Sequence, residues 1–335
     1  MAHSPKLEVY QIILKPRRNE DKTFRNFFCE KFEIDPDETN TEIFFRYFGA
    51  FIRSVDTEDF IENSTKQKAF TAYDTELTTE GDTVTISINA EKKIIDGTVE
   101  GGKYGLTRNK STLRNKQERE PIETQNVILD KFFFLIYTPF ESKIGVLFLQ
   151  SYSTETITDI FTDFLSSLFT HTPNFFKPTI SKFVPDQLKE EFKNSSIVQR
   201  FSYSTRYMDR DIPGEAFNDE ENQELIVKVE IVASKGIDKS RIRVWREKIE
   251  AGILYGKRLR DYTEKKGYLK NEANKKQAIF KLDTDFEIKP MIPLEDKINI
   301  VNGSPNFAEL KDYCLTLLED TIIPEVYRRN AVTER

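Results

Sequence analysis

An α+β fold, with a mixed and largely antiparallel sheet covered by helices, is what this 335-residue sequence predicts. Segments with the two-residue period of strands alternate along the chain with segments that have the 3.6-residue period of helices. Near the middle, residues 127–138 and 144–150 are apolar runs joined by a short turn, which is the pattern of an antiparallel hairpin. Because these runs are apolar on both faces, we expect helices on both sides of the sheet.

Before this hairpin, the sequence predicts strands and two helices. Residues 7–15 are strand-like up to Pro16, and residues 23–33 and 41–54 carry aromatic side chains at helical spacing. In residues 82–89, valine and isoleucine alternate with threonine, serine and asparagine, as in a half-buried strand. Further strands are predicted at 69–73 and 93–99.

After the hairpin, the clearest helix is predicted between residues 153 and 171, where apolar side chains recur on one helical face. A long amphipathic helix is predicted over 240–264, again because its apolar residues share one face. Gly252 and Gly256 lie one turn apart within it, and we interpret them as a point of close approach to another backbone. The remaining elements are a helix at 185–192, strands at 178–184, 196–207, 225–233 and 278–290, and a last helix at 307–318.

The length predicts two domains, or one large one. Residues 103–119 form a strongly basic segment with few apolar side chains, and we interpret this segment as a mobile loop at the domain boundary. The predicted division is an N-terminal α+β domain at 1–120 and a C-terminal α+β domain at 121–335. The second domain would contain the central hairpin, the long amphipathic helix and the last helix.

Several kinds of site lack the residues that they need. The chain has two histidines, His3 and His171, and no Cys-x-x-Cys pair, so zinc sites and histidine-based triads have little to build on. His171 follows a predicted helix end, where its cation suits the helix dipole. The glycines around Lys103 are not followed by the hydroxyl and helix of a phosphate loop, and they predict a turn instead. The alternative is a backbone surface that approaches a phosphate or a sugar. We predict no cofactor.

Cysteine use and hydropathy predict a cytoplasmic protein without membrane contact. Cys29 and Cys314 lie near opposite ends of the chain, and we expect both to be free thiols in a reducing compartment. No signal peptide is visible. The longest near-apolar stretch, residues 132–137, is too short to span a bilayer.

The distribution of charge is the main functional signal. The formal net charge is −6, yet residues 103–119 carry six Lys and Arg against one Glu, and residues 235–276 carry fourteen against six. Such concentration of positive charge favours binding to nucleic-acid phosphates; the alternative is an ordinary charged helix face. The candidate phosphate-binding residues are Lys103, Arg108, Lys110, Arg114, Lys116, Lys257, Arg258, Arg260, Lys265 and Lys266.

Two alternative functions follow from other residues. A magnesium-dependent nuclease would use Asp285, Glu287 and Lys289, which alternation places on one face of a strand; the simpler interpretation is a solvated strand face. A subunit of a protein assembly would use the acidic loop 209–224 to meet a basic segment of its own or another chain. We favour nucleic-acid binding without catalysis. A role in a prokaryotic defence or mobile-element system is a further hypothesis, and it does not rest on any particular residue.

Overall fold

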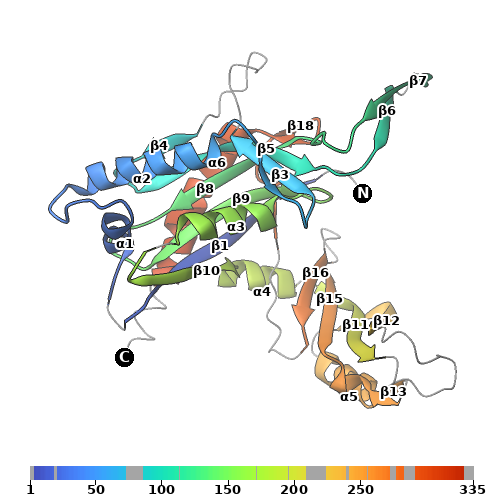
Figure 1. The fold of residues 1–335 in the computed structure, drawn as a ribbon. Coiled ribbons are helices and arrows are strands. Elements are labelled where there is room, and N and C mark those ends of the chain that lie inside the picture. Colours follow the sequence, from blue (N-terminus) through green and yellow to red (C-terminus); the bar gives the residue numbers. More distant parts are fainter. Residues whose placement is uncertain are drawn as a thin grey trace. The chain divides into compact units, whose positions relative to one another are not determined.

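The computed structural model describes eleven segments of the chain (Figure 1). They are residues 4–18, 21–72, 86–112, 114–170, 172–194, 196–208, 224–238, 241–254, 256–271, 277–282 and 291–327. Helices and largely antiparallel strands are mixed along these segments, which confirms the predicted α+β class.

The chain divides into two compact units at positions that differ from the predicted division. Unit 1 is Met1–Phe183 together with Ile292–Arg335, and unit 2 is Val184–Met291. The predicted boundary at residue 120 lies within unit 1, because strands from either side of it pair in one sheet. Unit 2 is therefore an insertion into unit 1.

Unit 1 is built on a nine-stranded sheet in which every pairing is antiparallel. The strand order is β10-β1-β9-β8-β5-β3-β2, with β17 beside β1 and β4 beside β5. The strands are β1 (Pro5–Pro16), β2 (Ile61–Asn63), β3 (Lys68–Ala72), β4 (Ser87–Asn89), β5 (Ile94–Lys103), β8 (Asp130–Tyr137), β9 (Ile144–Tyr152), β10 (Phe175–Phe183) and β17 (Ile292–Pro293).

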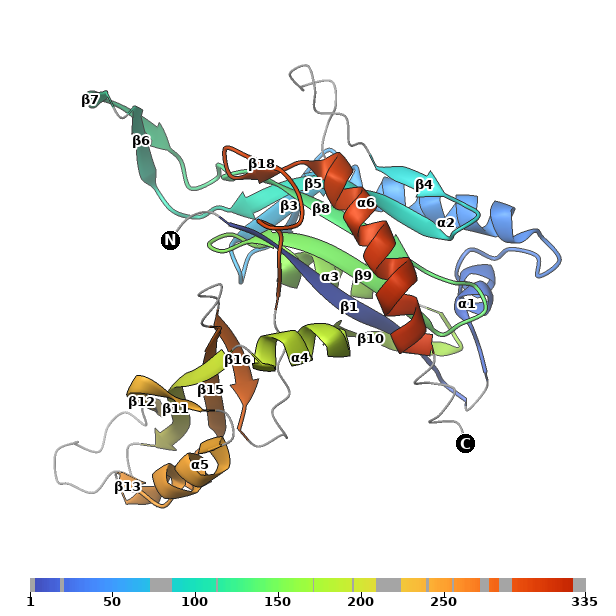
Figure 2. The ribbon, with the colours of Figure 1, turned by 180° about the vertical axis from the view of Figure 1, so that it is seen from behind.

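Helices lie on both faces of this sheet, as the apolar hairpin predicted. On one face α1 (Phe24–Lys31), α2 (Asn40–Val55) and α3 (Thr158–Leu168) share a phenylalanine-rich core with the strands. On the other face lies α6 (Phe307–Leu317), continued by a π-helical turn at Leu318–Ile322 (Figure 2). Alternate side chains of β8 therefore reach opposite layers, and Phe132 to Ile136 are all fully buried.

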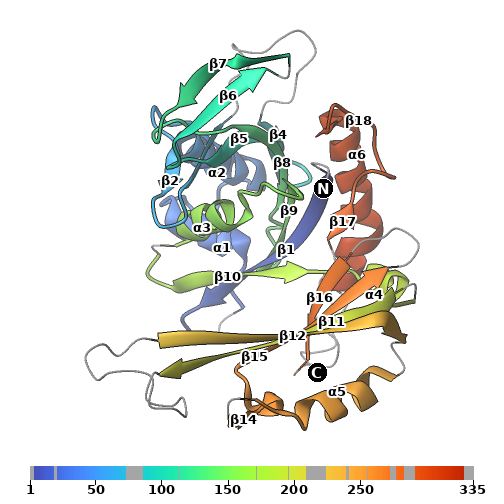
Figure 3. The same ribbon diagram turned by 90° about the vertical axis from the view of Figure 1, so that its right-hand side faces the viewer.

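Unit 2 contains a four-stranded antiparallel sheet in the order β12-β11-β15-β16. Its strands are β11 (Ser196–Met208), β12 (Glu224–Asp238), β15 (Glu264–Asn271) and β16 (Gln277–Lys281), preceded by helix α4 (Asp186–Asn194). Helix α5 (Ile242–Glu250) lies against one face of the sheet (Figure 3). Its Ile242 joins Phe201, Tyr203 and Leu269 in the core of this unit.

The long helix predicted over 240–264 is wrong: α5 ends at Glu250. A short hairpin follows, made of β13 (Ile253–Leu254) and β14 (Lys257–Arg258), then a 3-10 turn at Leu259–Asp261. Gly256 lies in the turn of this hairpin, and its φ of +73° belongs to the left-handed region that only glycine adopts readily, so the chain cannot be helical there. The predicted apolar face is also not buried throughout, since Trp245 is 40% exposed.

The interpretation of residues 103–119 as a loop is also wrong. Lys103 ends β5, and β6 (Arg108–Thr112) pairs with β7 (Asn115–Ile122) in a separate hairpin. Lys110 lies opposite Glu120 in this pairing, so opposite charges face each other across the two strands. Of the predicted strand 278–290, β16 covers the start, and residues 283–290 lie outside the described segments, as do His171 and most of the acidic loop, residues 209–223.

Candidate nucleic-acid interface

The hairpin β6–β7 carries four of the ten predicted phosphate-binding residues. Arg108, Lys110 and Arg114 are exposed, and Lys116 lies on β7. Lys103 is not part of the hairpin: it ends β5, and its Nζ lies 3.1 Å from a carboxylate oxygen of Glu155. Between Arg108 and Ile122 the sequence has five Lys and Arg against two Glu, so the hairpin has a net charge of +3.

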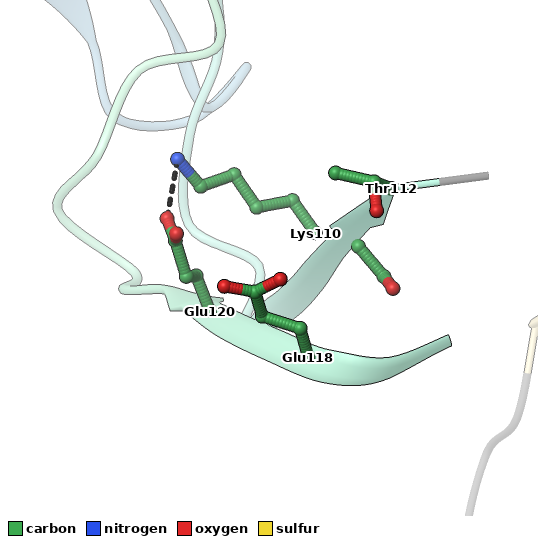
Figure 4. Close-up of a pocket in the computed structure, with 5 residues that line it drawn as sticks. Lys110, Thr112, Glu118 and Glu120 are labelled. Carbon is green, nitrogen blue, oxygen red and sulfur yellow. Dashed lines mark ion pairs between the residues drawn. The ribbon is translucent and has the colours of Figure 1, made fainter. Parts of the chain in front are cut away.

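A pocket opens on this hairpin, lined by Lys110, Ser111, Thr112, Glu118 and Glu120 (Figure 4). The ammonium group of Lys110 lies 2.6 Å from a carboxylate oxygen of Glu120, and the side-chain amide of Asn115 donates a hydrogen bond to Glu118 at 3.0 Å. With two carboxylates against one ammonium, the pocket does not favour an anion. Phosphate contact by the hairpin would therefore use the arginines outside the pocket.

The predicted basic residues of unit 2 do not form one patch. Lys265 belongs to the face of the sheet that α5 covers, because it lies opposite Tyr203. Lys257 lies on β14, outside this sheet, and its ammonium donates to Thr205 Oγ1 at 3.3 Å. Arg258, the last residue of β14, and Arg260, in the 3-10 turn that follows, are both exposed. Lys266 lies on the opposite face, next to Glu264 at 2.9 Å.

That opposite face carries a set of residues from all four strands, which we name the open face. Strand pairing places its members side by side, because residues paired across antiparallel strands point to the same side of a sheet. Its members are Arg200, Ser202, Ser204, Arg206, Ile226, Lys228, Glu230, Val232, Glu264, Lys266, Tyr268, Ile279 and Lys281.

The open face is basic and accessible. It has five Lys and Arg against two Glu, a net charge of +3; Lys270 and Asp238 lie at one end of the same face and offset each other. The apolar residues Ile226 and Val232, both on the edge strand β12, are 69% and 64% exposed. Among the described residues of unit 2, the helical side chains that join the core come from α5 and the 3-10 turn, on the other side of the sheet.

Arg200 is held rigidly at the centre of the open face. Its guanidinium lies 3.9 Å from the centre of the Tyr268 ring, a cation–π contact. One of its terminal nitrogens also donates to Glu230 at 3.0 Å. Lys228 approaches the other oxygen of Glu230 at 2.9 Å. Glu230 thus contacts both cations, Arg200 through one oxygen and Lys228 through the other.

Ionisation on the open face follows these contacts. The hydrogen bond from Lys228 lowers the pKa of Glu230 and raises the pKa of Lys228 itself. In the same way, the hydrogen bond from Lys266 lowers the pKa of Glu264. These directions favour the ionised form of both carboxylates and the charged form of Lys228 at neutral pH.

Of the five cations of the open face, the sequence predicted Lys266 and did not predict Arg200, Arg206, Lys228 and Lys281. Two signals were present: the strict alternation in residues 224–232, where charged or exposed residues take every second position, and the corresponding alternation in β11. The pairing of the strands was the missing information.

The candidate nuclease residues Asp285, Glu287 and Lys289 lie outside the described residues. Within the described segments, no group of three or more His, Cys, Asp or Glu side chains is placed to hold a metal ion. The helices in these segments include none with the length and apolar content needed to cross a membrane.

Comparison with protein-family models, with curated proteins and with solved structures finds no match to this chain.

Proposed function

We propose that this protein binds nucleic acid, mainly through contacts between the open face of unit 2 and backbone phosphates. The observation that carries the proposal is the charge of this face, five cations against two carboxylates on a chain whose formal net charge is −6. Each lysine or arginine that neutralises a phosphate releases a counterion, which favours binding. The arginines of the hairpin β6–β7 supply a second set of phosphate contacts.

We place this activity in the cytoplasm. Cys29 and Cys314 are both buried and both free, as expected for a reducing compartment. The protein acts by binding and carries no catalytic group in this proposal.

The test is fluorescence anisotropy with a labelled oligonucleotide and a variant in which Lys228, Lys266 and Lys281 are all changed to Gln. We expect this variant to lose at least about tenfold in affinity at 100 mM salt, because three phosphate contacts are removed.

The matched control changes the same number of exposed lysines in unit 1: Lys15, Lys177 and Lys297, each to Gln. It alters the net charge equally and leaves the open face intact. If both triple variants lost the same affinity for the oligonucleotide, the loss would follow from the change in net charge alone. That result would contradict the proposal.

A further inference from the structure

One row of the open face is suited to something other than phosphate. Val232, Arg200, Tyr268 and Ile279 are neighbours across all four strands of the unit 2 sheet. Three of the four side chains are apolar or aromatic, and Ile279 is 50% exposed. The guanidinium of Arg200 lies over the Tyr268 ring, so the centre of the row is a stacked pair of flat groups.

Flat groups of this kind are platforms for nucleobases. Bases stack on aromatic rings and on arginine guanidinium planes, and this contact tolerates any base because every base has a π-face. In a duplex the bases are stacked on one another and their faces are not accessible. The row therefore favours a strand whose bases are unpaired.

The next rows of the open face carry hydroxyl and carboxylate groups. Ser202 and Ser204 lie between the basic residues, and the hydroxyl of Ser204 donates to Glu264 at 3.3 Å. The carboxylates of Glu230 and Glu264 can only accept hydrogen bonds. A ribose 2′-hydroxyl offers them a donor, whereas the deoxyribose of DNA offers none.

We infer that the open face binds single-stranded RNA, an inference that rests on the proposed function. Unpaired bases stack on the Arg200–Tyr268 pair, with Val232 and Ile279 in apolar contact beside them. The phosphates lie along Lys228, Lys266 and Lys281, and the 2′-hydroxyls meet Ser204 and the two carboxylates, since Ser202 is buried. A positive face and a negatively charged strand are complementary in charge.

Three labelled probes test this inference on the full-length protein: an unstructured 20-nucleotide RNA, a DNA of the same sequence, and the RNA annealed to its complement. We expect the single-stranded RNA to bind several-fold more tightly than either of the others. The Arg200→Lys variant keeps the positive charge and replaces the planar guanidinium with an ammonium group. Its affinity for single-stranded RNA should fall about tenfold, while its affinity for the duplex should change little.

A second variant, Tyr268→Leu, removes the ring and keeps an apolar side chain on the strand. It should weaken binding of single-stranded RNA in the same way, and circular dichroism checks that both variants remain folded. If Arg200→Lys fails to fold, Tyr268→Leu still decides the question.

The outcomes separate this inference from the proposed function. Equal affinity for the three probes that is unchanged in Arg200→Lys and Tyr268→Leu would be consistent with phosphate binding. It would overturn the inference that the open face binds single strands. Equal affinity for single-stranded RNA and DNA would overturn the choice of RNA. No binding to any probe would overturn the proposed function itself. If the protein then also self-associates, the exposed apolar residues of the open face form a protein interface instead.

Discussion

At the scale of single residues, strand pairing decides which charges act together. Lys266 could be predicted as a surface cation because it lies in a basic stretch of the chain. Arg200 and Lys228 could not, because each is one cation among mixed residues, and only the sheet brings them beside Lys266. Conversely, Lys103 belongs to a basic stretch but is paired with Glu155. Local charge in the sequence therefore predicted only part of the site.

One residue-scale prediction concerns Gly267, which lies opposite Phe280 in the unit 2 sheet. A Cβ at this position would lie 2.0 Å from Cζ of Phe280, which is 1% exposed. We expect Gly267→Ala to lower the free energy of unfolding by about 1–3 kcal/mol, a typical cost of overpacking. Urea unfolding measures the difference.

The control for this change is Gly49→Ala in the middle of α2. A Cβ there meets only the flexible end of Arg53, at 3.4 Å. Because alanine loses less conformational entropy than glycine in a helix, we expect this variant to gain about 0.5–1 kcal/mol. We therefore expect Gly267→Ala to lower the free energy of unfolding and Gly49→Ala to raise it. If Gly267→Ala leaves it unchanged, the Phe280 ring can shift to accommodate the new methyl group.

At the scale of elements, strands with one buried face could be predicted and two other segments could not. The hairpin β6–β7 is exposed on both faces, so it lacks the apolar alternation that reveals a strand. The helix predicted over 240–264 failed for the opposite reason. Its apolar spacing continues beyond the end of α5 at Glu250, through a hairpin whose turn contains Gly256 with a left-handed φ, so the spacing alone does not mark where the helix ends.

The N-terminus of α2 gives an element-scale prediction about pH. Thr39 and Glu42 form a capping box: the Thr39 hydroxyl accepts from the Glu42 backbone, and the Glu42 carboxylate accepts from the Thr39 N–H and hydroxyl. These hydrogen bonds lower the pKa of Glu42. Since the folded-state pKa lies below the unfolded value of about 4.3, the stabilisation is present above that pH and is lost as the pH falls through the folded value.

We therefore expect Glu42→Gln to be less stable than the wild type at pH 7, with the difference shrinking as the pH is lowered from 5 towards 3. Urea unfolding at several pH values measures this difference. If the difference in the free energy of unfolding stays constant over this range, the charge of Glu42 contributes nothing to the stability of the cap. Thr39→Ala removes the hydroxyl and should cost about 1 kcal/mol at neutral pH.

At the scale of the whole molecule, unit 2 is inserted at one edge of β1. Phe183, the end of β10, pairs with Val9, and Ile292, in β17, pairs with Leu7. The two ends of the insertion thus lie about two residues apart along the same strand edge, or roughly 7 Å. The sequence predicted two domains, or one large one, but could not locate the division, because these pairings join residues that are far apart in the chain.

This arrangement predicts that unit 1 folds without unit 2. We expect a variant in which residues 185–290 are replaced by a short Gly-Ser linker to show cooperative thermal unfolding and an α+β circular dichroism spectrum, because the linker spans a short distance. Its affinity for nucleic acid should be much lower than that of the full chain. An unfolded variant would show that the two parts of the chain depend on each other for folding.

The measurement that tests the central claim most directly is the salt dependence of affinity for single-stranded RNA, compared between the wild type and the Lys228, Lys266 and Lys281 to Gln variant. Each phosphate contact on a single strand contributes about 0.7 to the slope of log affinity against log salt concentration. Loss of three contacts should therefore make the slope shallower by about 2. An unchanged slope would contradict the account, because it would mean that the open face of unit 2 does not contact phosphates.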